Sequence, residues 1–151
     1  MKRAALIERC TSCEQPGWLE LRDALWPQER DVQLAEMAAI AAQPQRFAAF
    51  VAYAQGGEVQ GFAEAAIRTD YVNGAQSSRV GFLEGLYVVP HARRNGVARL
   101  LVAEVTRWAA ECGCSELASD AALANTASHA LHRALGFEET ERVVYFRKPT
   151  S

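Results

Sequence analysis

The sequence lacks the features that would indicate a membrane protein or a nucleic-acid-binding protein. No apolar run approaches the roughly 20 residues that a bilayer-spanning helix needs. Basic residues are not in excess, since 16 Lys and Arg stand against 18 Asp and Glu, so we expect no basic face for nucleic acid. Glu8 and Arg9 interrupt the apolar N-terminal stretch, which argues against a signal peptide. We therefore expect a cytoplasmic protein that binds neither nucleic acid nor membrane.

Cysteine and histidine are also scarce, with 4 Cys and 3 His in the chain. The cysteines form two close pairs, Cys10 with Cys13 and Cys112 with Cys114. A zinc site is one interpretation of such pairs, but the second spacing is unlike a zinc ribbon and no histidine lies near either pair. We favour small, reduced cysteines in a cytosolic protein and predict that no metal is bound.

The chain has the size and composition of one globular domain. Its 151 residues are 50% hydrophobic and 23% charged, which predicts a single domain over residues 1–151 with a sizeable core. Hydrophobic periodicity predicts an α/β fold in which about four helices flank a single mixed sheet, mostly antiparallel in its early part. The expected strands are 4–10, 47–54, 59–67, 80–89, 116–120, 137–140 and 143–146, and the expected helices are 11–26, 31–43, 97–112 and 125–135.

Several helix boundaries rest on local signals. Thr11 and Glu14 fit a capping box for the first helix, although Pro16 offers a later start. Asp31 can cap the second helix. Asn125 or the threonine after it can begin the last one, whose Ala130, Leu131, Ala134 and Leu135 are expected to face inward.

The most informative stretch is an apolar strand that ends at Pro90, followed by a basic loop and an amphipathic helix. The N-terminus of a helix presents unpaired N–H groups and a partial positive charge, so this junction favours a phosphate ligand. Gly96 lets the backbone approach a ligand closely, and Arg93 and Arg94 add full positive charges. Neither the G-x-G-x-x-G fingerprint nor the P-loop pattern is present.

The residues from Arg93 to Ala98 resemble the [QR]-x-x-G-x-[GA] pyrophosphate loop of the GNAT superfamily of N-acetyltransferases. The segment from Asn125 to Phe137 resembles a second motif of that superfamily, N-x-x-A-x-x-L-Y-x-x-x-G-F, with His132 in place of the tyrosine. The resemblance implies a GNAT acyltransferase fold and acetyl-CoA as co-substrate. The cofactor-binding residues that it implies are Leu86, Tyr87, Val88, Arg93, Arg94, Asn95, Gly96, Val97, Ala98 and Asn125.

A closer resemblance runs from about Trp18 to Lys148, to the bacterial aminoglycoside 6′-N-acetyltransferases that confer antibiotic resistance. It rests on the segments 25–27, 70–74, 81–85, 116–120 and 136–142, of which the Asp-Tyr-Val-Asn-Gly loop and the Glu-Glu-Thr-Glu-Arg stretch are specific to that group. The implied activity is acetyl transfer to the 6′-amine by direct attack in a ternary complex. The implied substrate-binding residues are Trp26, Tyr71, Glu84, Asp120 and Glu141.

The chemistry of acetyl transfer needs a base, an oxyanion donor and a proton source, because only the free amine attacks a thioester. The resemblance places Glu84 and Asp120 at the acceptor amine. A bulge at Gly85 would free backbone N–H groups from Leu86 to Val88 to polarise the thioester carbonyl. His132 is the candidate that protonates the leaving thiolate, since histidine suits proton transfer near neutral pH, and water is the alternative donor.

Two other functions remain open from the sequence. One is a GNAT enzyme for another amine, such as a polyamine or a protein N-terminus, which would use the same CoA machinery. The other is a non-catalytic acyl-CoA sensor, which would have no use for Glu84 and Asp120 together. Members of the resembling group are typically dimers, and an open sheet edge would allow a homodimer here.

Overall fold

The computed structural model describes residues 4–151 and divides into two compact units, one that ends at Ser119 and one that begins at Asp120. The first unit contains a five-stranded sheet in the order β1-β2-β3-β4-β5. Neighbours from β1 to β4 run antiparallel, whereas β4 and β5 run parallel. The strands are β1 (Leu6–Arg9), β2 (Phe47–Tyr53), β3 (Val59–Arg68), β4 (Val80–Val88) and β5 (Leu117–Ser119). The predicted mixed α/β sheet is confirmed.

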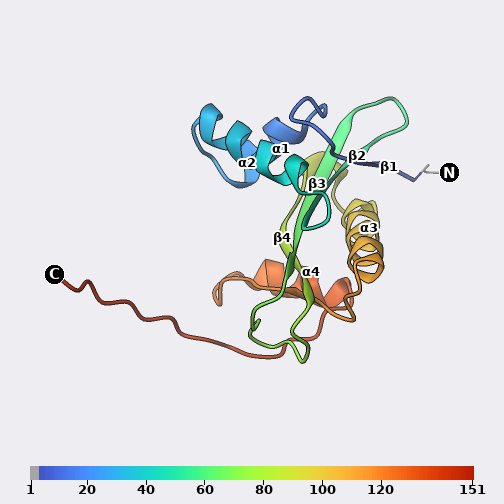
Figure 1. The fold of residues 1–151 in the computed structure, drawn as a ribbon. Coiled ribbons are helices and arrows are strands. Elements are labelled where there is room, and N and C mark those ends of the chain that lie inside the picture. Colours follow the sequence, from blue (N-terminus) through green and yellow to red (C-terminus); the bar gives the residue numbers. More distant parts are fainter. Residues whose placement is uncertain (1–3) are drawn as a thin grey trace. The chain divides into compact units, whose positions relative to one another are not determined.

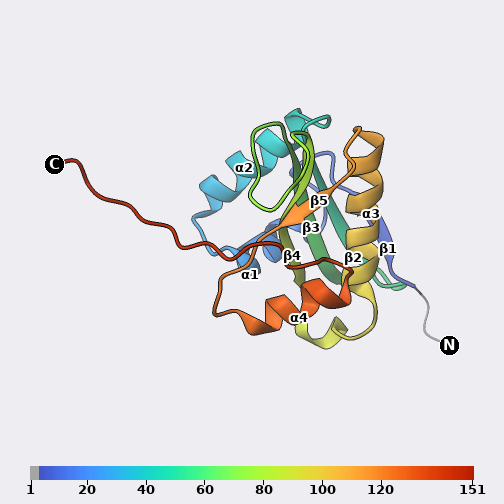
Figure 2. The same cartoon turned by 90° about the horizontal axis from the view of Figure 1, so that it is seen from below.

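Helices cover both faces of this sheet. Figures 1 and 2 show α1 (Trp18–Leu25) and α2 (Arg30–Ala42) on one face and α3 (Val97–Glu111) on the other. The short 3-10 helix η1 (Pro90–Ala92) connects β4 to the loop before α3. The apolar residues at helical spacing in this segment predict a core-facing side of α3, and four of them, Val97, Leu101, Val105 and Trp108, are buried, while Leu100 is half-buried. On the opposite face, Trp18, Met37 and Phe62 are fully buried in one core cluster.

The first two helices begin at other residues than their capping signals predict. Helix α1 follows Gly17, whose φ of 84° is left-handed, so neither the capping box at Thr11 nor the start at Pro16 is formed. A side chain at residue 17 would also crowd Val59. Helix α2 begins at Arg30 with Glu29 as its N-cap, so the predicted cap at Asp31 lies one residue inside the helix.

The second unit contains α4 (Thr126–Ala134), whose N-cap is formed as predicted. The Asn125 Oδ1 atom accepts a hydrogen bond of 3.1 Å from the Ser128 N–H. No residue of α4 is fully buried, so the predicted inward face of this helix is wrong. The predicted strands at 137–140 and 143–146 are also wrong, since residues 137–151 form no regular element.

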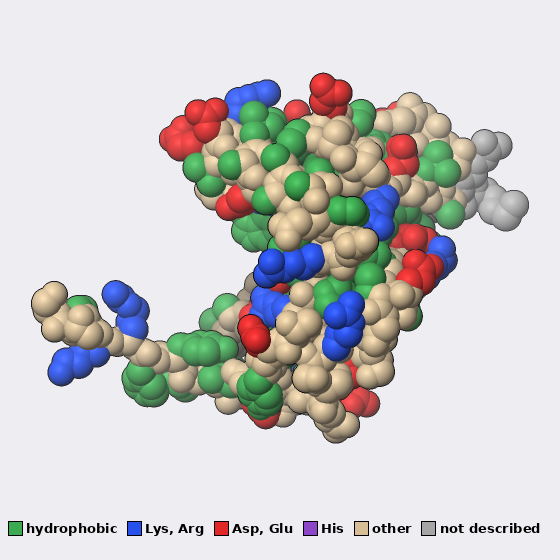
Figure 3. Space-filling view, in the orientation of Figure 1, with side chains coloured by type: hydrophobic (Ala, Val, Ile, Leu, Met, Phe, Trp, Pro, Cys, Tyr) green, Lys and Arg blue, Asp and Glu red, His purple; other side chains and the backbone are tan. Residues whose placement is uncertain are grey.

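The missing strands have a physical cause. A strand is stable only when a neighbouring strand pairs its N–H and C=O groups, and a correct alternation of side chains cannot supply that partner. Val144, Tyr145 and Phe146 are instead 70%, 81% and 92% exposed. Figure 3 shows hydrophobic side chains along the extended C-terminal stretch of the chain.

No helix within the described residues is long and apolar enough to cross a bilayer. Within the same residues, no three His, Cys, Asp or Glu side chains gather as a metal site requires. Burial raises the pKa of the Cys10 and Cys114 thiols, and it thereby disfavours the thiolate form that binds zinc. That the protein binds no metal stays a prediction.

Candidate active site

The site is built around a β-bulge in β4, where the sequence predicts one. Leu83 lies opposite Ala65 and Gly85 lies opposite Glu64, so Glu84 is the extra residue of the bulge. Strand β5 pairs with β4 only as far as Leu83. Residues 84–88 therefore continue along β3 with no partner strand on their other side within the described residues. Backbone groups on that open side, from Leu86 to Val88, can bind a ligand.

Glu84 does not stand alone, because its carboxylate is paired with Arg68 at the end of β3. The Arg68 Nη2 atom lies 2.8 Å from Oε1 and 3.0 Å from Oε2, and its Nε atom lies 3.3 Å from Oε1. The same guanidinium lies over the Phe82 ring, 3.6 Å from its centroid. Sequence reasoning missed Arg68, although a cation that directly ends an apolar strand beside a carboxylate-bearing strand was a usable signal.

Trp26 forms a wall beside the bulge and is held from several directions. A Cβ atom added to Gly85 would overlap the Trp26 indole, so the two residues are in direct contact. Phe62 meets the indole edge to face, with ring centroids 5.7 Å apart. The Gln33 side chain donates to the Trp26 carbonyl oxygen at 2.7 Å, and the Arg22 guanidinium lies 5.1 Å from the ring centroid.

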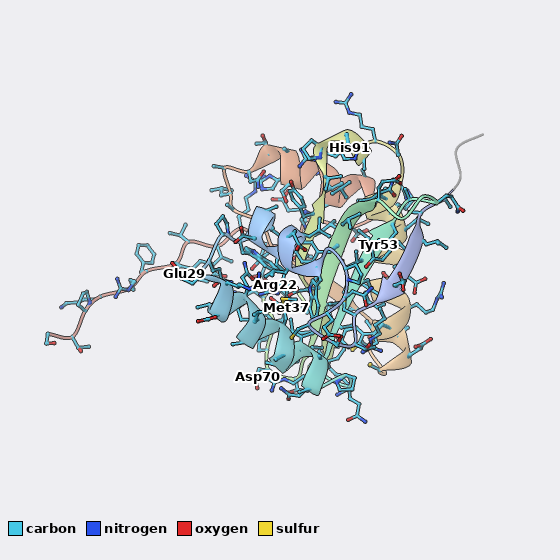
Figure 4. All side chains as sticks on the ribbon, turned by 90° about the horizontal axis from the view of Figure 1, so that it is seen from above. Arg22, Glu29, Met37, Tyr53, Asp70 and His91 are labelled. Atoms are coloured by element: carbon cyan, nitrogen blue, oxygen red, sulfur yellow. The ribbon has the colours of Figure 1, made fainter. Side chains whose placement is uncertain are left out.

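A buried ionic network supports this wall from α1, α2 and β3. Arg22 bonds both carboxylate oxygens of Glu64 and also Glu36, and its Nε atom donates to Gln33 Oε1 at 2.9 Å. The Trp18 indole N–H donates to Glu64 at 2.8 Å. Burial raises the pKa of Glu64, and the hydrogen bond and charge of Arg22 oppose that rise. Figure 4 shows Arg22 in the interior of this layer, whereas Glu29, just before α2, lies at its edge.

The network was also missed by sequence reasoning. Glu64 interrupts an apolar strand and Arg22 lies among the apolar residues of a helix, and both are almost fully buried. Charged residues are seldom buried unless they are paired, so two opposite charges in apolar segments were a signal that the segments pack together. Each of the two is a single polar break in an apolar pattern, so hydrophobic periodicity alone does not reveal that they pair.

The loop 69–79 between β3 and β4 carries Tyr71, which is 76% exposed. Val72 anchors one part of the loop by packing on Val80 and Phe82. Glu116, just before β5, anchors another part, since its carboxylate accepts from the Gln76 N–H at 3.1 Å and the Ser77 N–H at 2.8 Å. The hydrogen bond from the Ser77 hydroxyl, followed by these backbone bonds, lowers the pKa of Glu116.

The predicted phosphate-binding junction is present between η1 and α3. Gly96 has a φ of 82° and precedes α3 without a side-chain cap, which leaves the first-turn N–H groups of the helix available to an anion. Arg94 also has a positive φ, of 66°, so the loop turns sharply at two places. The Arg93 Nε atom donates to the Val88 carbonyl oxygen at 2.8 Å, and its guanidinium lies 5.7 Å from the Tyr87 ring centroid, so Arg93 also links this loop to the end of β4.

The remaining predicted residues belong to the second unit. His132 on α4 has its Nδ1 atom 2.7 Å from the Ser128 carbonyl oxygen, so Nδ1 carries a proton and donates it. The His132 ring meets the Phe137 ring at 5.2 Å between centroids. Asp120 and Glu141 are exposed, and Asn125 caps α4. The first unit thus brings together Trp26, Glu84 and the 84–88 backbone, while Asp120, Asn125, His132 and Glu141 lie in the other unit.

Comparison with known proteins supports a single family. The sequence pattern of the Acetyltransferase (GNAT) family matches residues 17–137. The chain is 49% identical over 146 residues to the aminoglycoside N(6′)-acetyltransferase type 1 of Stenotrophomonas maltophilia, a match that covers 97% of this chain and 94% of that protein. AAC(6′)-Iy, solved with the bisubstrate analogue CoA-S-monomethyl-acetylneamine, matches with a TM-score of 0.91 and 46% identity over 97% of this chain and 99% of that one. AAC(6′)-Ih from Acinetobacter baumannii matches with the same TM-score of 0.91, identity of 46% and coverage of 97% and 99%.

Proposed function

The chain belongs to the acetyltransferase (GNAT) family, and we propose that it transfers the acetyl group of acetyl-CoA to the 6′-amine of aminoglycoside antibiotics. The observation that carries the activity is the 49% identity to an aminoglycoside N(6′)-acetyltransferase over 97% of the chain. The sheet with a bulged, half-open β4 is the GNAT fold, and it agrees with the solved AAC(6′) structures. Transfer of this kind removes a positive charge from the antibiotic and confers resistance.

The residues present fit acetyl-CoA as co-substrate. The uncapped N-terminus of α3, with Gly96 before it, supplies N–H groups of the kind that bind a pyrophosphate. The open side of residues 84–88 supplies backbone groups for the pantetheine arm and for the thioester carbonyl. The proposed cofactor-binding residues are Leu86, Tyr87, Val88, Arg93, Arg94, Asn95, Gly96, Val97, Ala98 and Asn125. Part of the role of Arg93 is indirect, because its hydrogen bond to the Val88 carbonyl oxygen stabilises the end of β4.

Glu84 and Asp120 are the proposed acidic groups at the acceptor amine. The amine must lose a proton before it attacks the thioester, and a carboxylate within hydrogen-bond reach can take that proton directly or through a water. Attack by the free amine in a ternary complex then needs no acetylated enzyme. Trp26, Tyr71 and Glu141 are the other proposed substrate contacts, with Trp26 as the flat wall for a sugar ring.

His132 is proposed to protonate the leaving thiolate. Because Nδ1–H donates to the Ser128 carbonyl oxygen, a neutral ring has only a lone pair at Nε2. The ring can therefore give a proton from Nε2 only in its cationic form. Water remains the alternative donor, and a His132→Gln variant that keeps full turnover would favour it.

A panel of amine acceptors tests the proposed function. We expect release of CoA thiol with kanamycin, and no acetylation at the 6′ position of an aminoglycoside that carries a 6′-hydroxyl in place of the amine. Turnover of spermidine or a peptide without turnover of any aminoglycoside would support a GNAT enzyme for another amine. Binding of acetyl-CoA without transfer to any amine would support an acyl-CoA sensor.

We also propose that the chain acts as one domain in a cytoplasmic homodimer. The family match spans residues 17–137 and so includes parts of both units, which supports a single functional domain. All four cysteines are free thiols, as is usual in a reducing compartment. The exposed Val144, Tyr145 and Phe146 and the open edges of β1 and β5 supply surfaces that a second copy of this chain can cover.

A further inference from the structure

We propose that Arg68 is a built-in counter-ion of Glu84 that an ammonium group of the substrate must displace. The inference rests on the proposed function, because it concerns the carboxylate to which the acceptor amine is assigned. Arg68 binds both oxygens of that carboxylate, at 2.8 and 3.0 Å from Nη2. A substrate ammonium would therefore compete with a guanidinium already seated in the same place.

The pair is placed so that it can open. The side chains of Arg68 and Glu84 are 42% and 36% exposed, and exposed ion pairs contribute little because water screens them. The buried Arg22–Glu64 pair differs, since its side chains are 3% and 7% exposed. Breaking that buried pair would leave uncompensated charges, so of these two pairs the Arg68–Glu84 pair is the one suited to exchange with a ligand.

Arg68 has a second partner that remains when Glu84 is taken by the substrate. Its guanidinium lies 3.6 Å from the centroid of the Phe82 ring, which belongs to the buried cluster with Val72 and Val80. The ring holds the cation in place through its negative face. Exchange then needs only a small movement of the guanidinium away from the carboxylate, and no rearrangement of β3 or β4.

Because Arg68 already neutralises the Glu84 carboxylate in the free enzyme, every amine that binds this carboxylate does so with lower affinity. Removing the Arg68 charge should tighten binding of kanamycin by about 2- to 5-fold, the range that exposed ion pairs contribute. It should also make binding more sensitive to salt, because the site then meets a polycation with one more unpaired negative charge. A residue that merely stiffens β3 would instead weaken binding when it is replaced.

The test is a double-mutant cycle with Arg68→Gln and Glu84→Gln in the full-length protein. Kanamycin affinity is measured by calorimetry with CoA present, at two salt concentrations. We expect tighter binding in Arg68→Gln and no effect of that change once Glu84 is Gln. Arg68→Lys should restore the wild-type affinity in part. Arg46→Gln is the matched control, since that guanidinium lies 5.1 Å from the Phe47 ring centroid, and its affinity should not change.

Two outcomes would overturn the proposal. Weaker kanamycin binding in Arg68→Gln would make Arg68 a support for Glu84 or a direct substrate contact. An equal effect of Arg68→Gln in both Glu84 backgrounds would show that it does not act through that carboxylate. A wild-type protein that neither binds nor acetylates any aminoglycoside would instead contradict the proposed function, so the two failures are distinguishable.

Discussion

At the scale of single residues, contacts around Gly85 fix the geometry of the proposed acceptor site. Glu84 is the extra residue of the bulge and precedes Gly85. The Trp26 indole occupies the space that a side chain at residue 85 would fill. The guanidinium of the buried Arg22–Glu64 pair lies over that indole, and the Gln33 side chain donates to the Trp26 carbonyl oxygen. The acidic group and the aromatic wall are therefore fixed relative to each other by packing, which is what a preorganised site requires.

Replacing Gly85 with alanine should disturb substrate binding more than CoA binding. The new Cβ would overlap the indole, so Trp26 must move, and overpacking of this kind destabilises a protein by about 1–3 kcal/mol. We expect a raised KM for kanamycin, a lower melting temperature and an unchanged KM for acetyl-CoA. Steady-state kinetics and thermal unfolding measure these quantities.

A second substitution checks the cause. Combining Gly85→Ala with Trp26→Phe makes room for the methyl group, so the melting temperature should recover in part. If Gly85→Ala leaves both the kanamycin KM and the melting temperature unchanged, Trp26 is not fixed by this contact.

At the scale of secondary-structure elements, long buried segments were predictable from the sequence, whereas two helix starts and the contacts that hold loops were not. Strands β2, β3 and β4 and helix α3 were predictable to within one or two residues, because long periodic segments are buried on a known face. The starts of α1 and α2 were not predictable, since Gly17 and Glu29 precede these helices in place of the better capping residues nearby, whereas α3 and α4 begin where the sequence predicts. Arg68 and Glu116 were missed because their partners, Glu84 and the loop 69–79, lie in other segments of the chain.

A negative charge placed before α3 should weaken binding of the acetyl-CoA pyrophosphate at the proposed site on the N-terminus of this helix. A carboxylate in Gly96→Asp would compete for the first-turn N–H groups and repel the pyrophosphate. We expect acetyl-CoA to bind at least about tenfold more weakly by calorimetry, or about 1.4 kcal/mol. Gly96→Asn is the control of equal size without charge, and it should lose less. Equal affinity in the folded Gly96→Asp protein would rule out this helix end as the phosphate site.

Acid should loosen the loop 69–79 through Glu116. Its pKa lies below the ordinary glutamate value of 4.5, so its hydrogen bonds stabilise the fold above that pH and are lost as the pH falls through the lowered pKa. Glu116→Gln should therefore melt at a lower temperature than wild type at pH 7, and the difference should shrink in acid. We also expect a higher KM for kanamycin, because Tyr71 lies on this loop.

The control for this prediction is Glu111→Gln, which removes an exposed carboxylate at the end of α3. It should leave the kanamycin KM and the pH dependence of melting as they are in wild type. A constant difference in melting temperature between wild type and Glu116→Gln from pH 7 to pH 3 would contradict the assigned role.

At the scale of the whole molecule, the formal net charge of −2 is too small to attract a polycation over long distances. The selectivity for amines must then come from local carboxylates, and the Arg68 pair moderates one of them. The predicted C-terminal strands are the part of the fold that the single chain leaves unformed. Their alternating apolar residues indicate a strand, but the described chain offers them no neighbour to pair with.

A second copy of the chain can supply that missing neighbour. Contiguous exposed apolar side chains are uncommon on monomers, and four large ones follow one another at residues 143–146. Side chains two residues apart share a face of an extended segment, so Val144 and Phe146 would be buried together in an interface. Replacing both with lysine should convert the proposed dimer into a monomer, as measured by light scattering over a range of protein concentrations.

The control variant for this prediction reverses two charges in the same segment and leaves its apolar side chains in place. Arg147→Glu with Lys148→Glu alters the same segment and should leave the dimer intact if apolar burial drives association, because non-polar contacts are insensitive to salt and charge. A wild-type protein that is monomeric at every concentration would contradict the dimer. A dimer that survives the two lysines would place the interface elsewhere, and the open edges of β1 and β5 would then be the next surfaces to test.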